Sequence, residues 1–532
     1  MEHLSDNFQY NFKRKGIIEE PSEKDVHSYC LYLLKNKLDL HNRTFHQVGL
    51  NIGLSNLTTF KSADHRIQAP KDKILEVCSA NTLTDEQKRI FEKFKNVIAS
   101  PAQSLGFLEG PGGSGKTYLL NCILLECEKL KLIVAAVCAS GIAALLLLNG
   151  TTAHLAFGIR LNVQEDSTCN INATPICFRA VDCSLKDLRK SERPFGGISV
   201  LFSGDSRQIL PIVKNGNIYD QAVACLKKSY VWRLLTQYSL TQNLWCEAGS
   251  GIVSKGANDF AIWLQQLGNG ALQQWDIEKV KLSHLKFQFS KSLDSLKHEL
   301  TTFVYGDLDK VLSRGTRQMV MECFECGGVV TPLNLSVHDI NSLILERQTS
   351  RKYVSRSIDV CHENSLYDVP VEVLNSIQVP GFPRHKIDLK QMTPVILLRN
   401  LNIAKGLCNG TTLLVCEIRP HVLVCTFISG WNKGNTGLLR KIKLHHEEDK
   451  RDGFCFSRYQ FVIELAYAIT INKAQGQSFK HVGVYLSTDV FSHGQMYVAL
   501  SRACNKANVL VCGHGKANVQ LVTKVVVRSI AH

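Results

Sequence analysis

The chain has 532 residues, of which 45% are hydrophobic, 8% aromatic and 20% charged. A chain of this length and composition folds into several domains with packed cores, which excludes a disordered or a collagen-like protein. The 62 Lys and Arg residues against 47 Asp and Glu give a net charge of +15, which favours an anionic partner such as a nucleic acid and leaves a basic but inert surface as the alternative.

The start of the chain, MEHLSDNFQYNFKRK, lacks the apolar stretch of a secretory signal, so we expect the 19 Cys residues to be reduced. One C-x-x-C pair, Cys323 and Cys326, has no second pair at the spacing of a zinc ribbon, which favours buried free thiols over a zinc site. Residues 132–148 are apolar, but Ser140 and Gly141 interrupt them. We predict a buried strand, a turn and a buried helix there, and no membrane span.

The first part of the chain divides into an accessory segment and a first lobe. Residues 1–75 are mixed and polar, with one amphipathic patch at 29–40. Core-like sequence follows, and Thr84 is the predicted N-cap of its first helix, with Gln87 three residues later. From 76 to 235, apolar runs alternate with helical stretches, which is the pattern of βα units with a parallel sheet. The predicted fold class is α/β, and the predicted strands are 104–108, 132–139 and 198–203.

A second set of βα units fills residues 236–532, with apolar runs near Val329 and at 482–487. Within it, the runs 394–398 and 411–418 flank Asn409-Gly410, a strong hairpin signal, and another β run follows at 422–428. We therefore predict a second lobe at 236–532 with a small β-rich insertion at about 395–460.

The sharpest motif matches G-x-x-x-x-G-K-[ST] and lies between a predicted strand and a predicted helix. In such a loop the backbone N–H groups and the helix N-terminus bind phosphates, the lysine reaches the β- and γ-phosphates, and the final hydroxyl binds Mg²⁺. The sequence therefore predicts a nucleoside triphosphate ligand, with a flexible Gly-rich turn as the alternative. The residues of this loop are Gly110, Pro111, Gly112, Gly113, Ser114, Gly115, Lys116 and Thr117.

Later segments distinguish between the classes of P-loop protein. They are GTTAHLAFGI from Gly150, PFGGISVLFSGDSRQILPIV from Pro194, SLTQNLW from Ser239, YAITINKAQGQSF from Tyr467 and GQMYVALSRACN from Gly494. In order and spacing they resemble the helicase motifs of the PIF (petite integration frequency) DNA helicases, and especially the helicase region of Helitron transposons. The resemblance implies two RecA-like lobes, with ATP in the cleft between them and single-stranded DNA across the top.

The resemblance also implies roles for single residues. Gln208 would contact the γ-phosphate, and Arg502 would be the arginine finger from the second lobe. The alternatives are a strand cap for Gln208 and a surface salt bridge for Arg502. Gln87 corresponds to the glutamine that contacts adenine, and helix capping remains open for it.

For DNA, the resemblance implies backbone contacts by six residues whose hydroxyl, amide and imidazole groups contact phosphates without reading bases. A core histidine is the alternative for the single imidazole in this set. The six are Thr151, Thr152 and His154 in the first lobe and Thr470, Asn472 and Gln475 in the second.

The sequence departs from the family pattern at two places. Family members carry a strand ending in Asp-Glu, the Walker B pair that holds Mg²⁺ and activates water. Between Ile159 and Ile198 we find no such strand, because Glu165-Asp166 follows polar sequence and Asp182 precedes helical sequence. A decayed transposon copy or coding sequence skipped from the transcript would each explain the gap. The second departure is Trp245, which stands where the family has an arginine that touches the γ-phosphate.

These observations predict an ATP-dependent DNA helicase that uses ATP and Mg²⁺, moves 5′ to 3′ and acts on single-stranded and duplex DNA in repair, recombination or telomere maintenance. We expect a nuclear monomer with no membrane anchor and slow ATP hydrolysis. The first alternative is a catalytically impaired transposon remnant that binds ATP and single-stranded DNA. The second is a P-loop enzyme unrelated to nucleic acid, such as a nucleotide kinase, which would leave the motifs of the second lobe without a role.

Overall fold

The computed structural model describes residues 78, 82–100, 102–157, 174–211, 218–244, 255–272, 274–276, 279–281, 285–289, 292–361, 369–379, 381–446, 455–513 and 521–523. The chain divides into two units, Met1–Val77 and Cys78–His532. The predicted accessory segment and its amphipathic patch lie outside the described residues.

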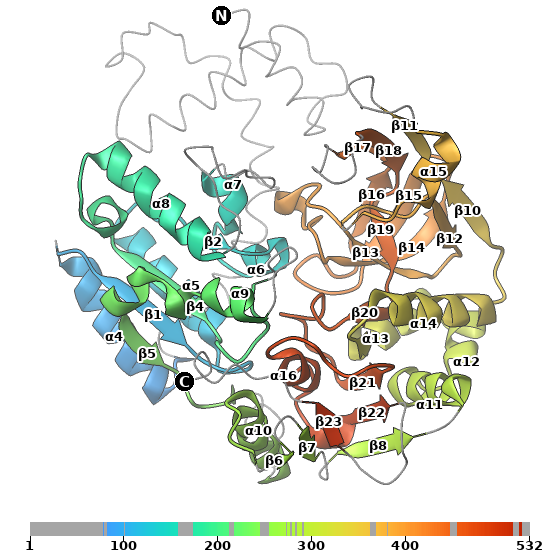
Figure 1. The fold of residues 1–532 in the computed structure, drawn as a ribbon, viewed down its shortest axis with the longest axis horizontal. Helices are drawn as coiled ribbons and strands as arrows, with labels where there is room; N and C mark the ends of the chain where they lie inside the picture. Colours follow the sequence, from blue (N-terminus) through green and yellow to red (C-terminus); the bar gives the residue numbers. More distant parts are fainter. Residues whose placement is uncertain are drawn as a thin grey trace, which may run out of the picture. The chain divides into compact units, whose positions relative to one another are not determined.

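The first lobe alternates strands with helices, as the βα pattern predicts (Figure 1). Its elements are α4 (Asp85–Ala99), β1 (Leu105–Glu109), α5 (Lys116–Lys129), β2 (Val137–Cys138), α6 (Gly141–Leu145), β3 (Thr151–Thr152), α7 (Ala153–Phe157), α8 (Thr174–Arg189), β4 (Val200–Gly204), α9 (Ile218–Val223) and β5 (Thr236–Ser239).

Local signals determine where α4 begins. The Thr84 side chain accepts a hydrogen bond from the Gln87 backbone N–H, and the Gln87 side chain accepts one from the Thr84 N–H, which completes a capping box. Asp85 and Glu86 in the first turn add favourable charge at the positive end of the helix dipole. The predicted N-cap is confirmed.

Strand β1 lies at the centre of the first sheet and contributes to a core on each face. Successive residues of a strand point to opposite faces, and here Leu108 packs with α4 and α5, whereas Phe107 packs with Phe195 and Val231. Parallel β4 and β5 flank β1, so the described order is β4-β1-β5. This arrangement brings the ends of β1 and β4 to the same edge, where Glu109 pairs with Gly204.

The predicted buried strand at 132–139 is wrong. Only β2, at its end, is a strand, and it pairs with the short β3 outside the main sheet. Leu132, Ile133 and Val134 are exposed to 46%, 77% and 47%. An apolar run becomes a buried strand only where neighbouring strands accept its hydrogen bonds, and β4 has no described strand on its second edge. The absence of the Walker B strand from the segment between Ile159 and Ile198 stays a prediction.

The second lobe contains a five-stranded parallel sheet in the order β20-β9-β21-β22-β8. Its two faces carry separate cores, one with α10 and α16 and the other with α11, α13 and α14. The elements around this sheet are α10 (Lys255–Gly268), β6 (Gln274–Asp276), β7 (Lys279–Lys281), β8 (Lys286–Phe289), α11 (Leu293–Tyr305), α12 (Leu308–Arg314), α13 (Arg317–Cys326), β9 (Gly327–Thr331), α14 (Asn334–Arg347), β20 (Ala468–Thr470), β21 (His481–Leu486), α16 (Gln495–Leu500), β22 (Val509–Gly513) and β23 (Leu521–Thr523).

An antiparallel region separates β9 and α14 from β20, where the sequence predicts a β-rich insertion. Its largest sheet has the order β16-β15-β14-β13-β19, and the buried ion pair between Arg458 and Asp359 lies in a neighbouring sheet. The region contains β10 (Tyr353–Arg356), β11 (Ile358–Cys361), α15 (Val371–Ser376), β12 (Lys386–Leu389), β13 (Pro394–Leu397), β14 (Thr412–Ile418), β15 (Val422–Phe427), β16 (Thr436–Arg440), β17 (Ile442–His446), β18 (Phe456–Gln460) and β19 (Ile463–Leu465).

The predicted strands 394–398 and 411–418 do pair, but Asn409-Gly410 is no two-residue hairpin turn. It lies within the long connection between β13 and β14, and the Gly410 N–H donates to the Leu397 carbonyl at 2.8 Å. Gly410 has a φ of 92°, which explains why glycine stands there.

Among the helices of the described ranges, none combines the length and the apolar character that crossing a bilayer requires. The exposed run 132–134 is not helical.

Candidate nucleotide site between the lobes

The P-loop connects β1 to α5 and is built on positive backbone angles. Gly113 and Gly115 have φ values of 82° and 73°, which L-residues with a side chain rarely adopt, and Gly115 is the residue before the first turn of α5. The Ser114 hydroxyl donates to the Pro111 carbonyl at 2.9 Å and holds the loop closed on itself. The loop therefore presents its backbone N–H groups at a helix N-terminus, which is the geometry that phosphate binding requires.

Lys116 lies across this loop. Its ammonium donates hydrogen bonds to the carbonyls of Gly110 and, at 2.9 Å, Pro111. Burial lowers the pKa of Lys116 to about 8; the nearby Asp205 carboxylate opposes this shift, and the Arg207 guanidinium adds to it. A lysine with this pKa is poised to gain an anionic partner, because a bound anion favours its charged form.

Gln87 contacts the P-loop from α4. Besides its capping bond, its side-chain amide donates to the Ser114 carbonyl at 3.1 Å, and an added Cβ at Gly115 would come within 2.5 Å of that amide nitrogen. The residue is 2% exposed. The structure thus shows the capping role that the sequence left open, together with a contact that positions the loop, while adenine contact by Gln87 stays a prediction.

The segment after β4 carries Gln208 and meets the second lobe. The side chain of Asp205 is fully buried, and its carboxylate accepts hydrogen bonds from Arg207 Nε at 2.7 Å and from the Tyr497 hydroxyl at 3.0 Å. Gln208 donates to Asp205 at 3.3 Å and accepts from Gln475 at 2.8 Å. The predicted γ-phosphate contact and one predicted DNA contact are therefore hydrogen-bonded to each other.

Arg502 is buried in the second lobe. It is 3% exposed, so the alternative of a surface salt bridge is wrong. Its guanidinium donates to the carbonyls of Val498 at 2.9 Å and Gln477 at 2.7 Å, and to the Ser501 hydroxyl at 2.9 Å. Burial lowers its pKa, and its chain neighbours Ser501 and Ala503 line the same hollow as Pro111 and Gly112 of the P-loop. The finger role stays a prediction, and in this state the side chain holds together the turn after β20.

The other predicted DNA contacts lie in the short strands β3 and β20 or just after them. Thr151 and Thr152 form β3 in the first lobe, and His154 follows in α7. Thr470 ends β20, and its hydroxyl accepts from the Lys473 N–H at 3.4 Å. Asn472 accepts from Gln495 at 3.3 Å, so this turn is tied to α16.

Oxygen donors for a divalent cation gather at the edge of the first sheet. Thr117 is the second residue of α5, Glu109 ends β1 and Asp205 follows β4. The described residues contain no cluster of three or more His, Cys, Asp and Glu side chains that could hold a metal. Asp182, a second carboxylate near the gap, is 1% exposed and bonds to Phe195, Lys186 and Tyr230, so its role is to anchor α8. Trp245 and Glu165-Asp166 lie outside the described residues.

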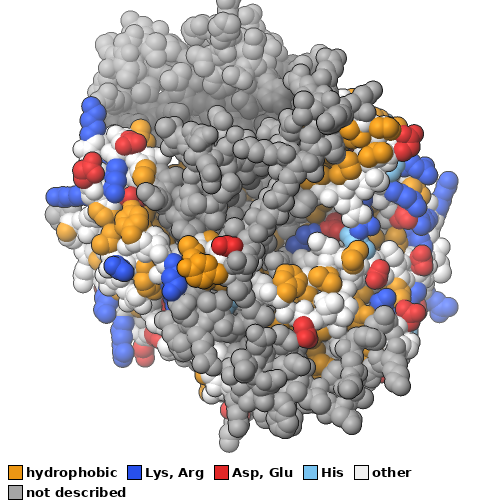
Figure 2. All heavy atoms as spheres, viewed as in Figure 1, with side chains coloured by type: hydrophobic (Ala, Val, Ile, Leu, Met, Phe, Trp, Pro, Cys, Tyr) orange, Lys and Arg blue, Asp and Glu red, His pale blue; other side chains and the backbone are white. Residues whose placement is uncertain are grey.

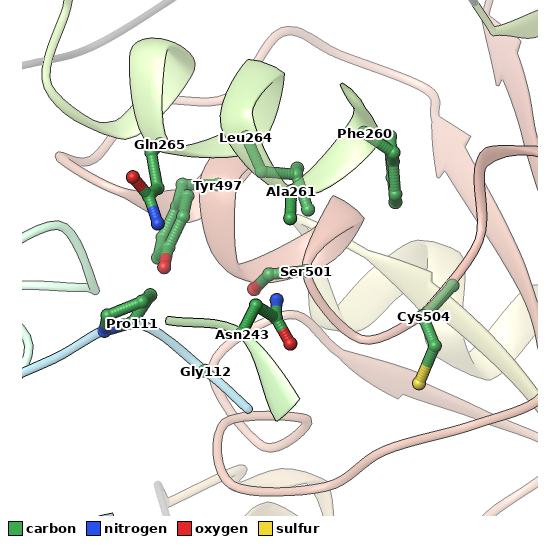
Figure 3. A pocket seen from close by; sticks show the side chains of 11 residues that line it. Pro111, Gly112, Asn243, Phe260, Ala261, Leu264, Gln265, Tyr497, Ser501 and Cys504 are labelled. Atoms are coloured by element: carbon green, nitrogen blue, oxygen red, sulfur yellow. The ribbon is translucent and has the colours of Figure 1, made fainter. Parts of the chain in front are cut away.

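A hollow opens beside the P-loop where the lobes meet. Figure 3 shows Gln265, Leu264 and Ala261 of α10 around it, with Tyr497 of α16 and Ser501 directly after that helix. The Tyr497 ring extends toward Pro111, and burial raises the pKa of the Tyr497 hydroxyl. The remaining lining residues are Gly112, Asn243, Phe260, Ala503 and Cys504.

Sequence reasoning missed three residues of this junction: Arg207, Tyr497 and His493. The buried His493 ring shares a hydrogen bond with the Ser206 carbonyl at 3.0 Å, and since a carbonyl only accepts, its Nε2 carries the proton. Arg207 and Tyr497 stand inside the quoted segments GDSRQ and YVALSRA, so the signal was present. The partners of Tyr497 and His493, Asp205 and Ser206, lie nearly 300 residues away in sequence, and only the fold brings them together.

Known proteins are similar to this chain over most of its length. The PIF1-like helicase family matches residues 82–176 and 172–278, and the 2B domain of DNA helicase Pif1 matches residues 372–418. ATP-dependent DNA helicase PIF7 of Trypanosoma brucei brucei is 25% identical over 81% of this chain and 46% of its own length. ATP-dependent DNA helicase PIF1 of Danio rerio is 23% identical over 81% of this chain and 61% of its own length. The chain therefore spans about half of the length of these curated relatives.

Solved structures show the same fold. Bacteroides Pif1 bound to single-stranded DNA aligns with a TM-score of 0.54 at 20% identity, over 81% of this chain and 92% of that one. Pif1 helicase from Candida albicans aligns with a TM-score of 0.51 at 20% identity, over 81% of this chain and 94% of that one. The α/β class with two RecA-like lobes is confirmed, whereas the particular likeness to Helitron helicase regions stays a prediction. By its motifs, its family matches and its fold, the chain is similar to the PIF1-like helicases.

Proposed function

We propose that the protein is an ATP-dependent DNA helicase that hydrolyses ATP to move along single-stranded DNA and separate duplex strands. One observation carries the proposal: Gln208, at the phosphate edge of the first lobe, is hydrogen-bonded to Gln475 in the predicted DNA segment of the second. Tyr497 reinforces this junction through Asp205. A change at the phosphates would therefore alter contacts at the DNA segment, which is the coupling that a translocating ATPase needs.

The nucleotide is ATP held by the P-loop. Its phosphates would meet the backbone N–H groups of the loop, and Lys116 would leave its two carbonyl partners to contact the β- and γ-phosphates. Gln208 and Arg502 approach the same edge, one from each lobe. The buried Arg502 would have to exchange a carbonyl partner for phosphate before it acts as a finger.

The donor set at this edge fits Mg²⁺, which prefers oxygen ligands and is usually held by one or two carboxylates together with substrate phosphates. The Thr117 hydroxyl makes no hydrogen bond to any described residue, and one oxygen of Glu109 is likewise unbonded within them. Bound Mg²⁺ would neutralise charge on the transferring phosphoryl group. Both oxygens of Asp205 already accept hydrogen bonds, so it is poorly suited to activate water, which supports slow hydrolysis.

The DNA is contacted through its backbone. The hydroxyl and amide groups of Thr151, Thr152, Thr470 and Asn472 suit phosphate and sugar atoms and carry no base-specific pattern. On the face drawn in Figure 2, the described Lys and Arg side chains are interspersed with Asp and Glu, so the net charge of +15 is not gathered in one described patch there. We infer binding that is salt-dependent and largely independent of sequence.

The family resemblance supports further details of the same proposal. They are 5′ to 3′ movement, action on duplex DNA, a monomeric state, a nuclear location, and a role in repair, recombination or telomere maintenance. None of them follows from the geometry of the site.

DNA-stimulated phosphate release tests the proposal. The purified chain should release phosphate from ATP faster when single-stranded DNA is added, and Lys116→Ala, which removes the ammonium, should abolish the release. A nucleotide kinase would show no DNA effect. A binding-only remnant would bind ATP and DNA but show no DNA-stimulated release, and either result would overturn the proposal.

A further inference from the structure

We propose that Arg207 contacts the γ-phosphate of the bound nucleotide and supplies a guanidinium from the first lobe. The inference rests on the proposed function, because it requires a nucleoside triphosphate at the P-loop. It adds a phosphate contact that the motif pattern does not assign.

The position of Arg207 follows from the sheet. Gly204 ends β4, and its carbonyl accepts a hydrogen bond from Gly110, the first residue of the P-loop, at 3.3 Å. Arg207 stands three residues further on, next to Gln208. Its segment therefore leaves the sheet at the edge where the P-loop begins, which is where parallel α/β sheets bind their ligands.

The stem of Arg207 is fixed by the second lobe. An added Cβ at Gly268, the last residue of α10, would come within 2.9 Å of its Cβ, Cγ and Cδ atoms. An added Cβ at Gly494 would come within 2.5 Å of its backbone carbonyl. Glycine at both places lets the segment pack closely, so the stem of the side chain has little freedom to move.

The guanidinium of Arg207 has N–H donors that no described residue accepts. The residue is 9% exposed, and its Nε donates to Asp205 at 2.7 Å. Within the described part of the chain, neither Nη1 nor Nη2 has a hydrogen-bond acceptor. Burying charged N–H donors without acceptors costs free energy. A phosphate is an anion whose oxygens match the geometry of the two remaining amino groups of the guanidinium.

The surrounding charges favour an anion. Among the described residues, Lys116 interacts electrostatically with the guanidinium groups of Arg207 and Arg502 and with the Asp205 and Glu109 carboxylates. Arg502 already gives its donors to Val498, Gln477 and Ser501. Arg207 is therefore the arginine of this cluster whose amino groups stay available, and its neighbour Gln208 is the predicted γ-phosphate contact.

The experiment compares two nucleotides on matched variants. Binding of ATPγS and ADP is measured by calorimetry for the full chain, Arg207→Met, Arg207→Lys and the control Arg347→Met, whose guanidinium pairs with Asp309 on the second lobe. Arg207→Met should weaken ATPγS about 10- to 100-fold, the range for a lost charged hydrogen bond, and leave ADP within about twofold. Arg207→Lys keeps the charge without the fork and should lie between. Arg347→Met should bind both as the parent does.

Two results would overturn the inference when the parent binds both nucleotides. Unchanged ATPγS affinity in Arg207→Met would show that no phosphate contact is made. Equal losses for ATPγS and ADP would show that Arg207 only maintains the shape of the loop. A parent that binds neither nucleotide would instead defeat the proposed function, and the inference with it.

Discussion

Raising the pH above 8 should weaken nucleotide binding, because it removes the proton from Lys116. Burial lowers the pKa of this ammonium to about 8; the Asp205 and Glu109 carboxylates oppose the shift, and Arg207 and Arg502 add to it. A bound triphosphate places negative charge beside the ammonium and raises its pKa in the complex. Above pH 8 the lysine is therefore protonated in the complex and increasingly neutral in the free protein.

The size and sign of the effect follow from these two pKa values. Below pH 8 the free lysine already holds its proton, and its contribution to affinity does not change. Above pH 8 the affinity falls toward tenfold per pH unit until the pH reaches the pKa of the complex. At pH 8.5 a group with a pKa of about 8 is roughly three-quarters neutral, so binding should take up about 0.75 of a proton.

Calorimetry with ATPγS between pH 7 and 9.5, in buffers of different ionisation enthalpy, measures both quantities. Lys116→Arg is the matched control, because its guanidinium keeps its proton over this range and its affinity should not fall. A parent affinity that is flat from pH 7 to 9.5, with no proton uptake at pH 8.5, would refute the claim that the Lys116 ammonium holds the phosphates.

Three further outcomes are expected. The affinity for single-stranded DNA should fall as the salt concentration rises, with a slope of several units in a plot of log affinity against log salt, and equally for two unrelated oligonucleotides. Fluorescence titrations at three salt concentrations measure this slope. A strong preference for one oligonucleotide would contradict contact through the DNA backbone. Grafting a Walker B strand after Asn172 together with Trp245→Arg should raise DNA-stimulated phosphate release about 10² to 10⁴-fold, and equal rates would show that a carboxylate such as Glu109 already does the work. Asp359→Asn should lower the free energy of unfolding by about 3–5 kcal/mol in urea titrations, because it leaves Arg458 buried with an unpaired charge. A loss under about 1 kcal/mol would mean that the pair is not buried in solution.

Local chemistry explains which parts of the fold could be predicted. The capping box of Thr84 and Gln87 and the glycines of the P-loop depend on neighbours within a few residues, and the structure shows both. The prediction of a buried strand at 132–139 was wrong because a strand needs neighbouring strands to pair with, and the first residues of this run are exposed. The prediction of a two-residue hairpin turn at Asn409-Gly410 was wrong because a longer loop joins the two paired strands.

The junction between the lobes marks the limit of sequence reasoning for the site. Motif spacing led to Lys116, Gln208 and Arg502. It did not predict that the guanidinium of Arg502 donates its hydrogen bonds to nearby carbonyls. It also did not predict that two amino groups of Arg207 make no hydrogen bond within the described residues. Such facts depend on the packing of α10 and α16 against the loop after β4, which no local pattern encodes.

Strand separation tests the central claim most directly. A fluorescent duplex with a 5′ single-stranded tail is mixed with an excess of protein, so that slow turnover suffices, and strand release is followed with ATP, with ATPγS and with Lys116→Ala. We predict release that requires both ATP and Lys116 and fails on a duplex with a 3′ tail. Strand release that proceeds without ATP, or no release by the parent chain in excess ATP, would contradict the account.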